Sequence, residues 1–323
     1  MDGSCGPSTI EATLRRIAIL VAVVILTACG DTTSPSSRTL VWTSVPSPTT
    51  KRLMSIWGSS PTDIWAVGEA LTNQTGDIIH YNGTTWSLVM SGTFLNSVWG
   101  TSASDVWAVG CCGNEIMHFN GTAWSNSNPL PSVLLHGVWG TSPSNVWAVG
   151  TGGTILHYDG TTWSGVPSGT AEDLWSVWGT SSSNVWAVAH NTILHYDGSS
   201  WSVNFDYSPF SVLLTSVWGS SATDVWALGS AGVRPLAFHY DASVWSEAST
   251  PPGRNFAMWG TGPTNLWAVG YADIGTGVSH WDGNSWTSID VGPLQGHYGI
   301  WGSSDSDVWI VGSGSILHGT AAD

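Results

Sequence analysis

A Trp-Gly pair recurs seven times along this chain, and this repeat limits the possible folds more than any other feature. The pairs begin 39 to 42 residues apart, at Trp57, Trp99, Trp139, Trp178, Trp218, Trp259 and Trp301. A period of this length, with four short apolar segments in each repeat, is typical of a β-propeller, in which one repeat forms one four-stranded blade. We therefore predict an all-β fold, a seven-bladed β-propeller of four-stranded blades.

One repeat illustrates the expected blade. Residues 137–164 hold apolar segments near Trp139, over 146–149, over 155–158 and near Trp163. The segment 146–149 is apolar at every position, as a strand buried on both faces between two neighbouring blades should be. The pair Asp159-Gly160 predicts a two-residue hairpin turn with positive φ at both residues. The fifth repeat has Asp241-Ala242 at this place, which should weaken its turn.

The seventh repeat lacks its last strand. It starts near Ile300 and ends after 316–318, without the tryptophan of a fourth segment. The segment 40–43, Leu-Val-Trp-Thr, matches the fourth segment of the other repeats. We therefore expect residues 39–45 to complete the last blade, so that the N-terminal strand closes the ring and removes exposed sheet edges.

The N-terminus has the pattern of an export signal. Arg15 and Arg16 precede a ten-residue apolar run over 17–26, which is too short to span a bilayer and suits a signal-peptide core. The run ends in Leu-Thr-Ala-Cys at 26–29 and resembles a bacterial lipobox, in which Cys29 becomes the lipidated first residue of the mature protein. The alternative is an ordinary signal peptide with a chance cysteine.

The lipobox resemblance implies three parts: a lipoprotein signal peptide over 1–28, the lipidated Cys29 and a polar tether over 29–38, and the propeller over 39–323. It implies an exported protein that contacts the membrane only through its lipid. Because Gly30 and not an aspartate follows the cysteine, the membrane would be the outer one if the organism has one.

Charge excludes one class of partner. The net charge is −15 and only seven residues are Lys or Arg, so the chain has too few cations to bind a nucleic acid backbone. No segment after residue 28 is long and apolar enough to span a bilayer. We expect a monomer that binds a protein or a glycan of the cell envelope.

Three residue types recur in register. Each complete repeat has three tryptophans, which we interpret as packing between blades, the alternative being a sugar-binding or quaternary-ammonium-binding surface.

One histidine per repeat is interpreted as a structural hydrogen-bonding group and not a metal ligand. These are His80, His118, His157, His195, His239, His280 and His318. An Asp or Asn precedes each second-strand apolar segment and should bond to nearby backbone, with calcium binding as the alternative. These are Asp63, Asp105, Asn145, Asn184, Asp224, Asn265 and Asp307. We predict no cofactor and no metal.

The repeats resemble the Trp-rich β-propeller lipoproteins of bacteria that carry BNR or Asp-box repeats, over about residues 39–323. The element Asp-Gly-x-x-Trp at 159–163 resembles an Asp box, one residue shorter than the usual form. The segments 146–150 and 153–158 resemble the tectonin repeat of propeller lectins.

Some BNR propellers are sialidases, which bind a substrate carboxylate with three arginines. Only Arg234 and Arg254 lie within the blades here, and no other catalytic motif is present. We therefore predict that the protein is not an enzyme.

The pair Cys111-Cys112 has two interpretations, a vicinal disulfide or two ordinary turn thiols.

The candidate ligand site lies among the variable loops. In a four-stranded blade the 2–3 and 4–1 connections share one face of the disc, and these connections differ most between repeats. Those of the neighbouring fifth and sixth blades should bring together Arg234, Arg254, Tyr271 and Asp273. The favoured function is a non-catalytic protein-interaction or scaffold propeller. The alternative is a lectin-like glycan binder, and a hydrolase or lyase has less support.

Overall fold

The computed structural model describes residues 39–69, 75–111, 116–127, 133–208, 210–271, 277–292 and 296–322. The chain divides into two units, Met1–Ser36 and Ser37–Asp323, and every described residue belongs to the second. The predicted signal peptide, Cys29 and the tether lie outside the described residues. Within the described ranges, no helix has the length and apolar character needed to cross a membrane.

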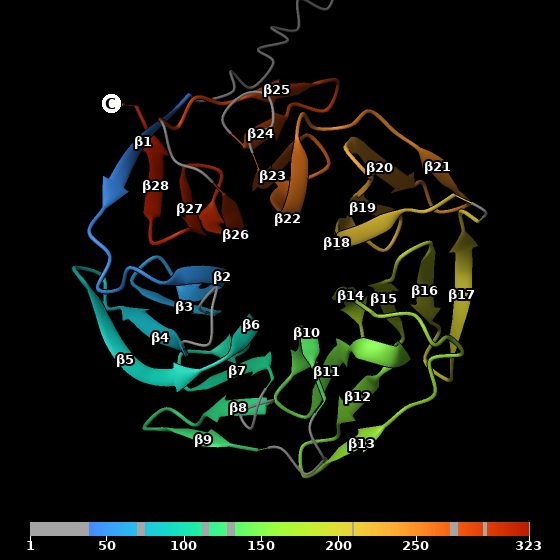
Figure 1. Cartoon of the computed structure of the whole chain (residues 1–323), viewed down its shortest axis with the longest axis horizontal. Helices are drawn as coiled ribbons and strands as arrows, with labels where there is room; N and C mark the ends of the chain where they lie inside the picture. The colour runs from blue at the N-terminus through green and yellow to red at the C-terminus, as the bar shows by residue number, and fades with distance from the viewer. Residues whose placement is uncertain are drawn as a thin grey trace, which may run out of the picture. The chain divides into compact units, whose positions relative to one another are not determined.

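The second unit is a ring of seven four-stranded antiparallel sheets, as predicted (Figure 1). The innermost strands of the blades, in chain order, are β2 (Arg52–Ser60), β6 (Leu95–Ser102), β10 (Leu135–Ser142), β14 (Ser176–Ser181), β18 (Leu213–Ser221), β22 (Arg254–Gly262) and β26 (His297–Ser304). The second strands are β3 (Asp63–Glu69), β7 (Asp105–Gly110), β11 (Asn145–Gly150), β15 (Asn184–Val188), β19 (Asp224–Ala231), β23 (Asn265–Tyr271) and β27 (Asp307–Gly312). The third strands are β4 (Gly76–Tyr81), β8 (Ile116–Phe119), β12 (Ile155–Tyr158), β16 (Thr192–Tyr196), β20 (Arg234–Tyr240), β24 (Val278–Trp281) and β28 (Ile316–Ala321). The outer strands of blades one to six are β5 (Trp86–Thr93), β9 (Trp124–Asn126), β13 (Trp163–Gly165), β17 (Trp201–Asp206), β21 (Trp245–Glu247) and β25 (Trp286–Ser288). One 3₁₀ turn, Thr151–Gly153, follows β11.

The outer strand of the seventh blade comes from the start of the propeller, as predicted. Strand β1 (Leu40–Val45) pairs antiparallel with β28, with Leu40 opposite Ala321 and Val45 opposite Ile316. The backbone N–H of Ala322 donates to the carbonyl of Thr39 at 3.4 Å, so the two ends of the propeller are adjacent. The first and last strands of the unit are therefore held together by a complete ladder.

The Trp-Gly pair is a packing device between successive inner strands. A Cβ on Gly219 would lie 2.6 Å from the indole of Trp178, the corresponding tryptophan of the preceding blade. The same contact recurs around the ring, and a Cβ on Gly58 in the first blade would lie 2.6 Å from Trp301 in the last. Each large ring therefore needs a residue without a side chain in the next blade, which explains why the two residues recur together.

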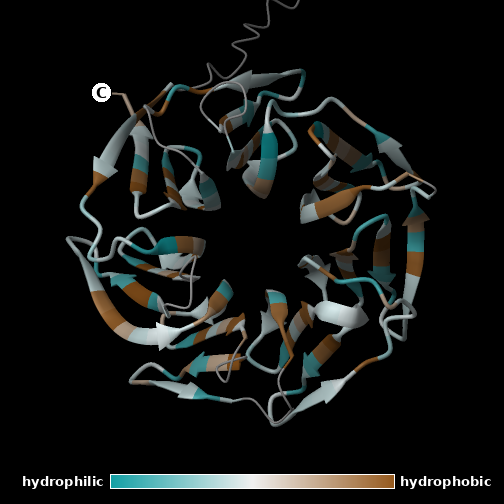
Figure 2. Cartoon of the chain, in the orientation of Figure 1, coloured by the Kyte–Doolittle hydropathy of each residue, from teal (hydrophilic) through white to brown (hydrophobic). Residues whose placement is uncertain are grey.

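A second set of tryptophans fills the space between blades. The second-strand tryptophans are 1% to 5% exposed: Trp65, Trp107, Trp147, Trp186, Trp226, Trp267 and Trp309. Trp147 packs edge-on against Trp201 of the following blade with ring centroids 5.4 Å apart. Trp309 packs in the same way against Trp86 of the first blade. The predicted role of this ladder in blade packing is confirmed, and Figure 2 shows apolar residues recurring in the strands of every blade.

The histidine ladder is structural, as predicted. Each third-strand histidine bonds through Nε2 to the Asp or Asn that begins the second strand of its own blade, at 2.6 to 2.8 Å. A Ser or Thr hydroxyl at the end of the inner strand completes each set, as Thr101 does for Asp105. These Asp and Asn side chains therefore tie three strands of one blade together.

The hairpin turns between third and outer strands are wider than predicted. Tyr158 pairs with Trp163, which leaves a four-residue loop, 159–162. Asp159 Oδ1 accepts from the backbone N–H groups of Thr161 and Thr162, and among the described turn residues only the glycine position has positive φ. Because the aspartate side chain bonds to the backbone of the turn, the turn needs only one residue with positive φ, whereas a two-residue turn would need two. In the fifth blade Ala242 takes this conformation with φ of 77°.

Candidate functional site

The inner strands expose one variable side chain each to the central channel. It lies three residues before the tryptophan of each Trp-Gly pair. We call these seven residues the mouth ring: Met54, Asn96, His136, Trp175, Thr215, Phe256 and Tyr298. All of them line the channel, and all of them line a cavity of about 450 Å³ at its opening. This opening lies on the face of the disc that carries the 2–3 and 4–1 connections, which we call the mouth face.

The cavity lining is mostly apolar. Besides the mouth ring it includes Arg52, Leu134, Leu213 and Tyr271. Leu134, directly before β10, and Tyr271, at the end of β23, are 36% and 39% exposed, so both present apolar or aromatic surface to the cavity. The described lining contains no Asp or Glu, and its polar groups are uncharged apart from the guanidinium of Arg52. Concave apolar surfaces of this size are the common form of a ligand site.

One side of the cavity is a preorganised aromatic cluster. The rings of Phe256 and Tyr298 lie nearly parallel, 19° apart, and Tyr271 stands edge-on to both. The hydroxyls of the two tyrosines share a hydrogen bond of 2.6 Å. The guanidinium of Arg52 lies 4.9 Å from the centre of the Tyr298 ring, on the same side. Burial, and the hydrogen bond with the Tyr271 hydroxyl, raise the pKa of Tyr298, so this phenol remains neutral at physiological pH.

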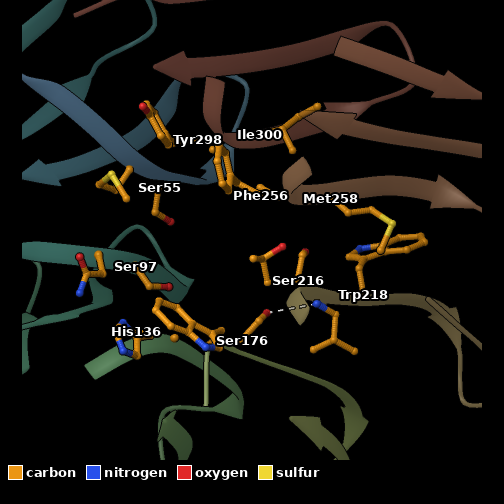
Figure 3. Close-up of a pocket in the computed structure, with 18 of the residues that line it drawn as sticks. Ser55, Ser97, His136, Ser176, Ser216, Trp218, Phe256, Met258, Tyr298 and Ile300 are labelled. Atoms are coloured by element: carbon orange, nitrogen blue, oxygen red, sulfur yellow. Dashed lines mark hydrogen bonds between the residues drawn. The ribbon is translucent and has the colours of Figure 1, made fainter. Parts of the chain in front are cut away.

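The other side is more polar. Figure 3 shows His136 across the channel from Tyr298 and Phe256. The imidazole of His136 stacks on Trp175 with ring centroids 4.2 Å apart. Burial lowers its pKa, and the nearby carboxylate of Asp173 offsets this only in part, so the ring is neutral at pH 7. Asn96 donates through Nδ2 to the carbonyl of Leu135 at 2.8 Å and so spans two blades.

Below the mouth ring the channel is lined by small residues that join the blades. The hydroxyl of Ser176 accepts from the backbone N–H of Val217 at 3.3 Å, the contact drawn in Figure 3. Ser55 and Ser97 accept from the next blade in the same way. An inner strand is a sheet edge, and these bonds satisfy backbone groups that would otherwise face the channel. The tier below the mouth ring is therefore structural.

The structure separates the residues predicted to form the site. Arg254 and Tyr271 lie opposite each other at the paired ends of β22 and β23, and Tyr271 lines the cavity. Arg234 instead lies on the outer part of the fifth blade, where it forms an ion pair with Glu247. Asp273 lies outside the described residues. Of the described candidates, Tyr271 lines the cavity, Arg254 is its strand partner but does not belong to the lining, and Arg234 is held elsewhere.

The mouth ring was not singled out from the sequence, although a signal for it exists. With the seven repeats aligned on their Trp-Gly pairs, the position three residues earlier carries seven different amino acids. The next position is Ser, Gly or Ala, and the one after it is Ile, Val or Met. The long connections attracted the prediction because insertions are conspicuous, whereas a variable residue within a strand is not.

The described residues contain no group of three or more His, Cys, Asp or Glu side chains placed to hold a metal ion. Cys111 is disulfide-bonded and is therefore not a free thiol, and Cys112 lies outside the described residues.

No protein-family profile and no curated protein matches this sequence. Solved structures do match its fold. YCF48 bound to D1 peptide has a TM-score of 0.67 and 17% identity, covering 88% of this chain and 100% of that one. A catalytically inactive virginiamycin B lyase from Staphylococcus aureus, with quinupristin, has a TM-score of 0.74 and 14% identity, with coverages of 88% and 100%. The WD40 β-propeller domain of Doa1 has a TM-score of 0.67 and 13% identity, covering 88% of this chain and 98% of that one. At these identities the likeness shows the β-propeller fold alone.

Proposed function

We propose that this chain is a non-catalytic protein-interaction propeller of the cell envelope, anchored through Cys29, that binds a peptide segment of its partner in the mouth cavity. The cavity carries the proposal, because it combines an apolar lining, a rigid aromatic cluster and a volume of about 450 Å³. Rigid aromatic side chains give large contact area at a low cost in conformational entropy, which suits them to protein recognition.

The charge distribution supports a site on the mouth face. Every Lys and Arg within the described residues lies at a strand end or connection on that face: Lys51, Arg52, Arg234 and Arg254. The opposite face holds nine aspartates at or beside its turns: Asp63, Asp105, Asp159, Asp197, Asp224, Asp241, Asp282, Asp305 and Asp307. A neutral or acidic partner therefore approaches the mouth face with the least repulsion.

The non-catalytic part of the proposal is supported by the cavity's chemistry. General acid–base or nucleophilic catalysis needs a pair of groups within hydrogen-bonding reach of each other. Arg52 lies beside Tyr298, Figure 3 shows Tyr298 across the channel from His136, and no carboxylate belongs to the described lining of the cavity. The lyase among the structural neighbours shares the fold at 14% identity, which gives catalysis little support.

Glycan binding is the second candidate. The observation that favours it is the partly exposed Tyr271, whose ring and hydroxyl border the cavity, since sugar rings stack on aromatic faces. A peptide is preferred because one side of the cavity is an apolar and aromatic surface, which suits an apolar side chain. In addition, the neighbour YCF48 was solved with a peptide.

The test is a binding screen of residues 30–323 against a random linear peptide display library and, in parallel, an array of envelope glycans. Each positive is measured again with the double variant Tyr271→Ala, Phe256→Ala. The matched control is Val244→Ala, an exposed apolar residue on the opposite face. Peptide binding that weakens about tenfold or more in the double variant alone supports the proposal. Binding of glycans only would favour the second candidate, and peptide binding unaffected by the double variant would contradict the site.

The anchor is tested separately in cells. Cys29→Ala should abolish incorporation of a labelled fatty acid and release the protein from the membrane fraction. An unlabelled parent protein would contradict the lipoprotein proposal without affecting the binding site.

A further inference from the structure

We propose that the mouth ring sets the specificity of this propeller, and that its apolar arc receives one large, uncharged apolar side chain of the partner peptide. This inference rests on the proposed function and names the chemistry of its ligand. The apolar arc consists of Phe256, Tyr298 and Met54, on the neighbouring blades six, seven and one, together with Tyr271.

The fold constrains every neighbouring position of the inner strand but leaves the mouth ring free to differ. The tryptophan and glycine are fixed by their contact between blades. The residue before the tryptophan is buried in all seven blades, at 4% to 7% exposure. The residue before that is small because inner strands approach each other there, and a Cβ on Gly299 would lie 2.9 Å from Ser55 Cα. The mouth-ring side chain instead lines the channel and the cavity at its opening, so ligand contact can contribute to its identity.

The mouth ring is chemically divided. The side chains of blades six, seven and one are aromatic or thioether and are consecutive around the channel, whereas blades two to five carry an amide, an imidazole, an indole and a hydroxyl: Asn96, His136, Trp175 and Thr215. Figure 3 shows Phe256 and Tyr298 on one side of the channel and His136 on the other. A ligand that enters the cavity therefore meets an apolar surface on one side and hydrogen-bonding groups on the other. This arrangement suits a peptide, which carries an apolar side chain next to polar backbone amides.

The apolar arc is also uncharged. Tyr298 is 7% exposed and its hydroxyl is already bonded to that of Tyr271, so neither phenol needs a ligand as a partner. A cationic ligand group placed against Phe256 and Met54 would lose its hydration without gaining a counter-charge, because the described lining of the cavity contains no Asp or Glu. The arc therefore selects leucine-like or aromatic side chains over Lys and Arg.

The experiment compares the peptides selected by three proteins from one random linear display library. These are residues 30–323 in the parent form, the variant Met54→Glu and the control Val244→Glu on the opposite face. The half-buried position of Met54 allows a polar side chain, and near-ultraviolet circular dichroism verifies folding. Met54→Gln, which keeps the length of the side chain without its charge, replaces the glutamate variant if that variant does not fold.

The parent should enrich one large uncharged apolar residue at a fixed place in the selected peptides. Met54→Glu should weaken binding of those peptides by about tenfold or more and select Lys or Arg at that place. Met54→Gln should weaken binding of those peptides less than Met54→Glu does, and Val244→Glu should leave the selection unchanged. The inference is overturned if the parent selects charged residues there, or if both Met54 variants leave the selection unchanged while Tyr271→Ala, Phe256→Ala still abolishes it. Failure of every library peptide to bind the parent would instead contradict the proposed function itself.

Discussion

Ala242 shows how much one side chain costs at a position that the repeat reserves for glycine. The equivalent residues of blades one to four and six are glycines with φ between 90° and 97°, whereas Ala242 adopts φ of 77° with a Cβ. An L-residue in this region is strained by about 1–2 kcal/mol, and the greater freedom of glycine in the unfolded chain offsets part of the gain from removing it. Ala242→Gly should therefore raise the free energy of unfolding by about 0.5–1 kcal/mol in urea titrations.

The matched control is the reverse change in blade four. A Cβ on Gly198 would lie 2.7 Å from that of Ser183, so Gly198→Ala should destabilise the protein by about 1–2 kcal/mol. Equal effects of the same sign for both changes would show that this φ value does not govern the turn.

The histidine ladder predicts a pH dependence that differs between blades. Where the partner is asparagine, burial lowers the pKa of His157, and Asp159 offsets this only in part. The imidazole of His157 therefore binds a proton more readily in the unfolded chain than in the folded protein. The contribution of neutral His157 to stability is full above pH about 6.5 and is lost as the pH falls below that value. Where the partner is aspartate, burial would raise the pKa of Asp105, but hydrogen bonds from His118 and Thr101 outweigh it and lower that pKa.

Asn145→Asp should convert the first kind of pair into the second. A carboxylate 2.7 Å from His157 Nε2 should raise the histidine pKa, which nuclear magnetic resonance titration measures directly. A raised folded pKa adds stability below pH about 6.5, so the fall in Tm between pH 7 and 5 should become smaller than in the parent. An unchanged His157 pKa would contradict the assigned cause.

At the scale of elements, strand β1 is expected to determine whether the seventh blade is complete. Leu40 is 7% exposed, and Trp42 packs edge-on against Trp267 of the sixth blade, with ring centroids 5.6 Å apart. Loss of these two side chains removes about 5 kcal/mol of apolar burial and exposes the edge of β28. Deletion of residues 38–46 should therefore lower the Tm by about 10 °C or more in calorimetry. Val41→Ser on the exposed side of the same strand is the control and should change the Tm little; an equal loss in both would show that burial by β1 is not the cause.

Sequence patterns predicted these elements well because each repeated residue answers a local packing demand. The period, the missing fourth segment near residue 318 and the match at 40–43 together fix seven blades and the closing strand. Repeated packing residues do not reveal the mouth ring. A side chain that faces an open channel follows the same alternation along a strand as a side chain that faces a core. Arg234 was grouped with Arg254 from loop position alone, and its ion pair with Glu247 depends on the outer strands of its own blade.

At the scale of the whole molecule, the ring is closed by a strand that belongs to the other end of the propeller. Blades one and seven can separate only if the six-residue ladder between β1 and β28 breaks first. Because Thr39 and Ala322 are adjacent, a short linker can join them and new ends can be opened elsewhere. Opening the chain at residues 46–51 gives a circular permutant in which every blade is one continuous segment. This permutant buries the same surface between blades one and seven. However, β1 is no longer joined to β2, so the β1–β28 ladder no longer holds blades one and seven together.

We expect this permutant to keep the parent's far-ultraviolet circular dichroism and to unfold about tenfold faster or more in stopped-flow denaturant jumps, because ring opening no longer requires a ladder to break. The control has the same join but is opened in the hairpin at 197–200, so that β17 becomes the closing strand of blade four. It retains an interlocked blade and should unfold at nearly the parent's rate. Equal rates for both permutants would show that chain continuity between blades, and not the interlocking strand, limits unfolding of this propeller.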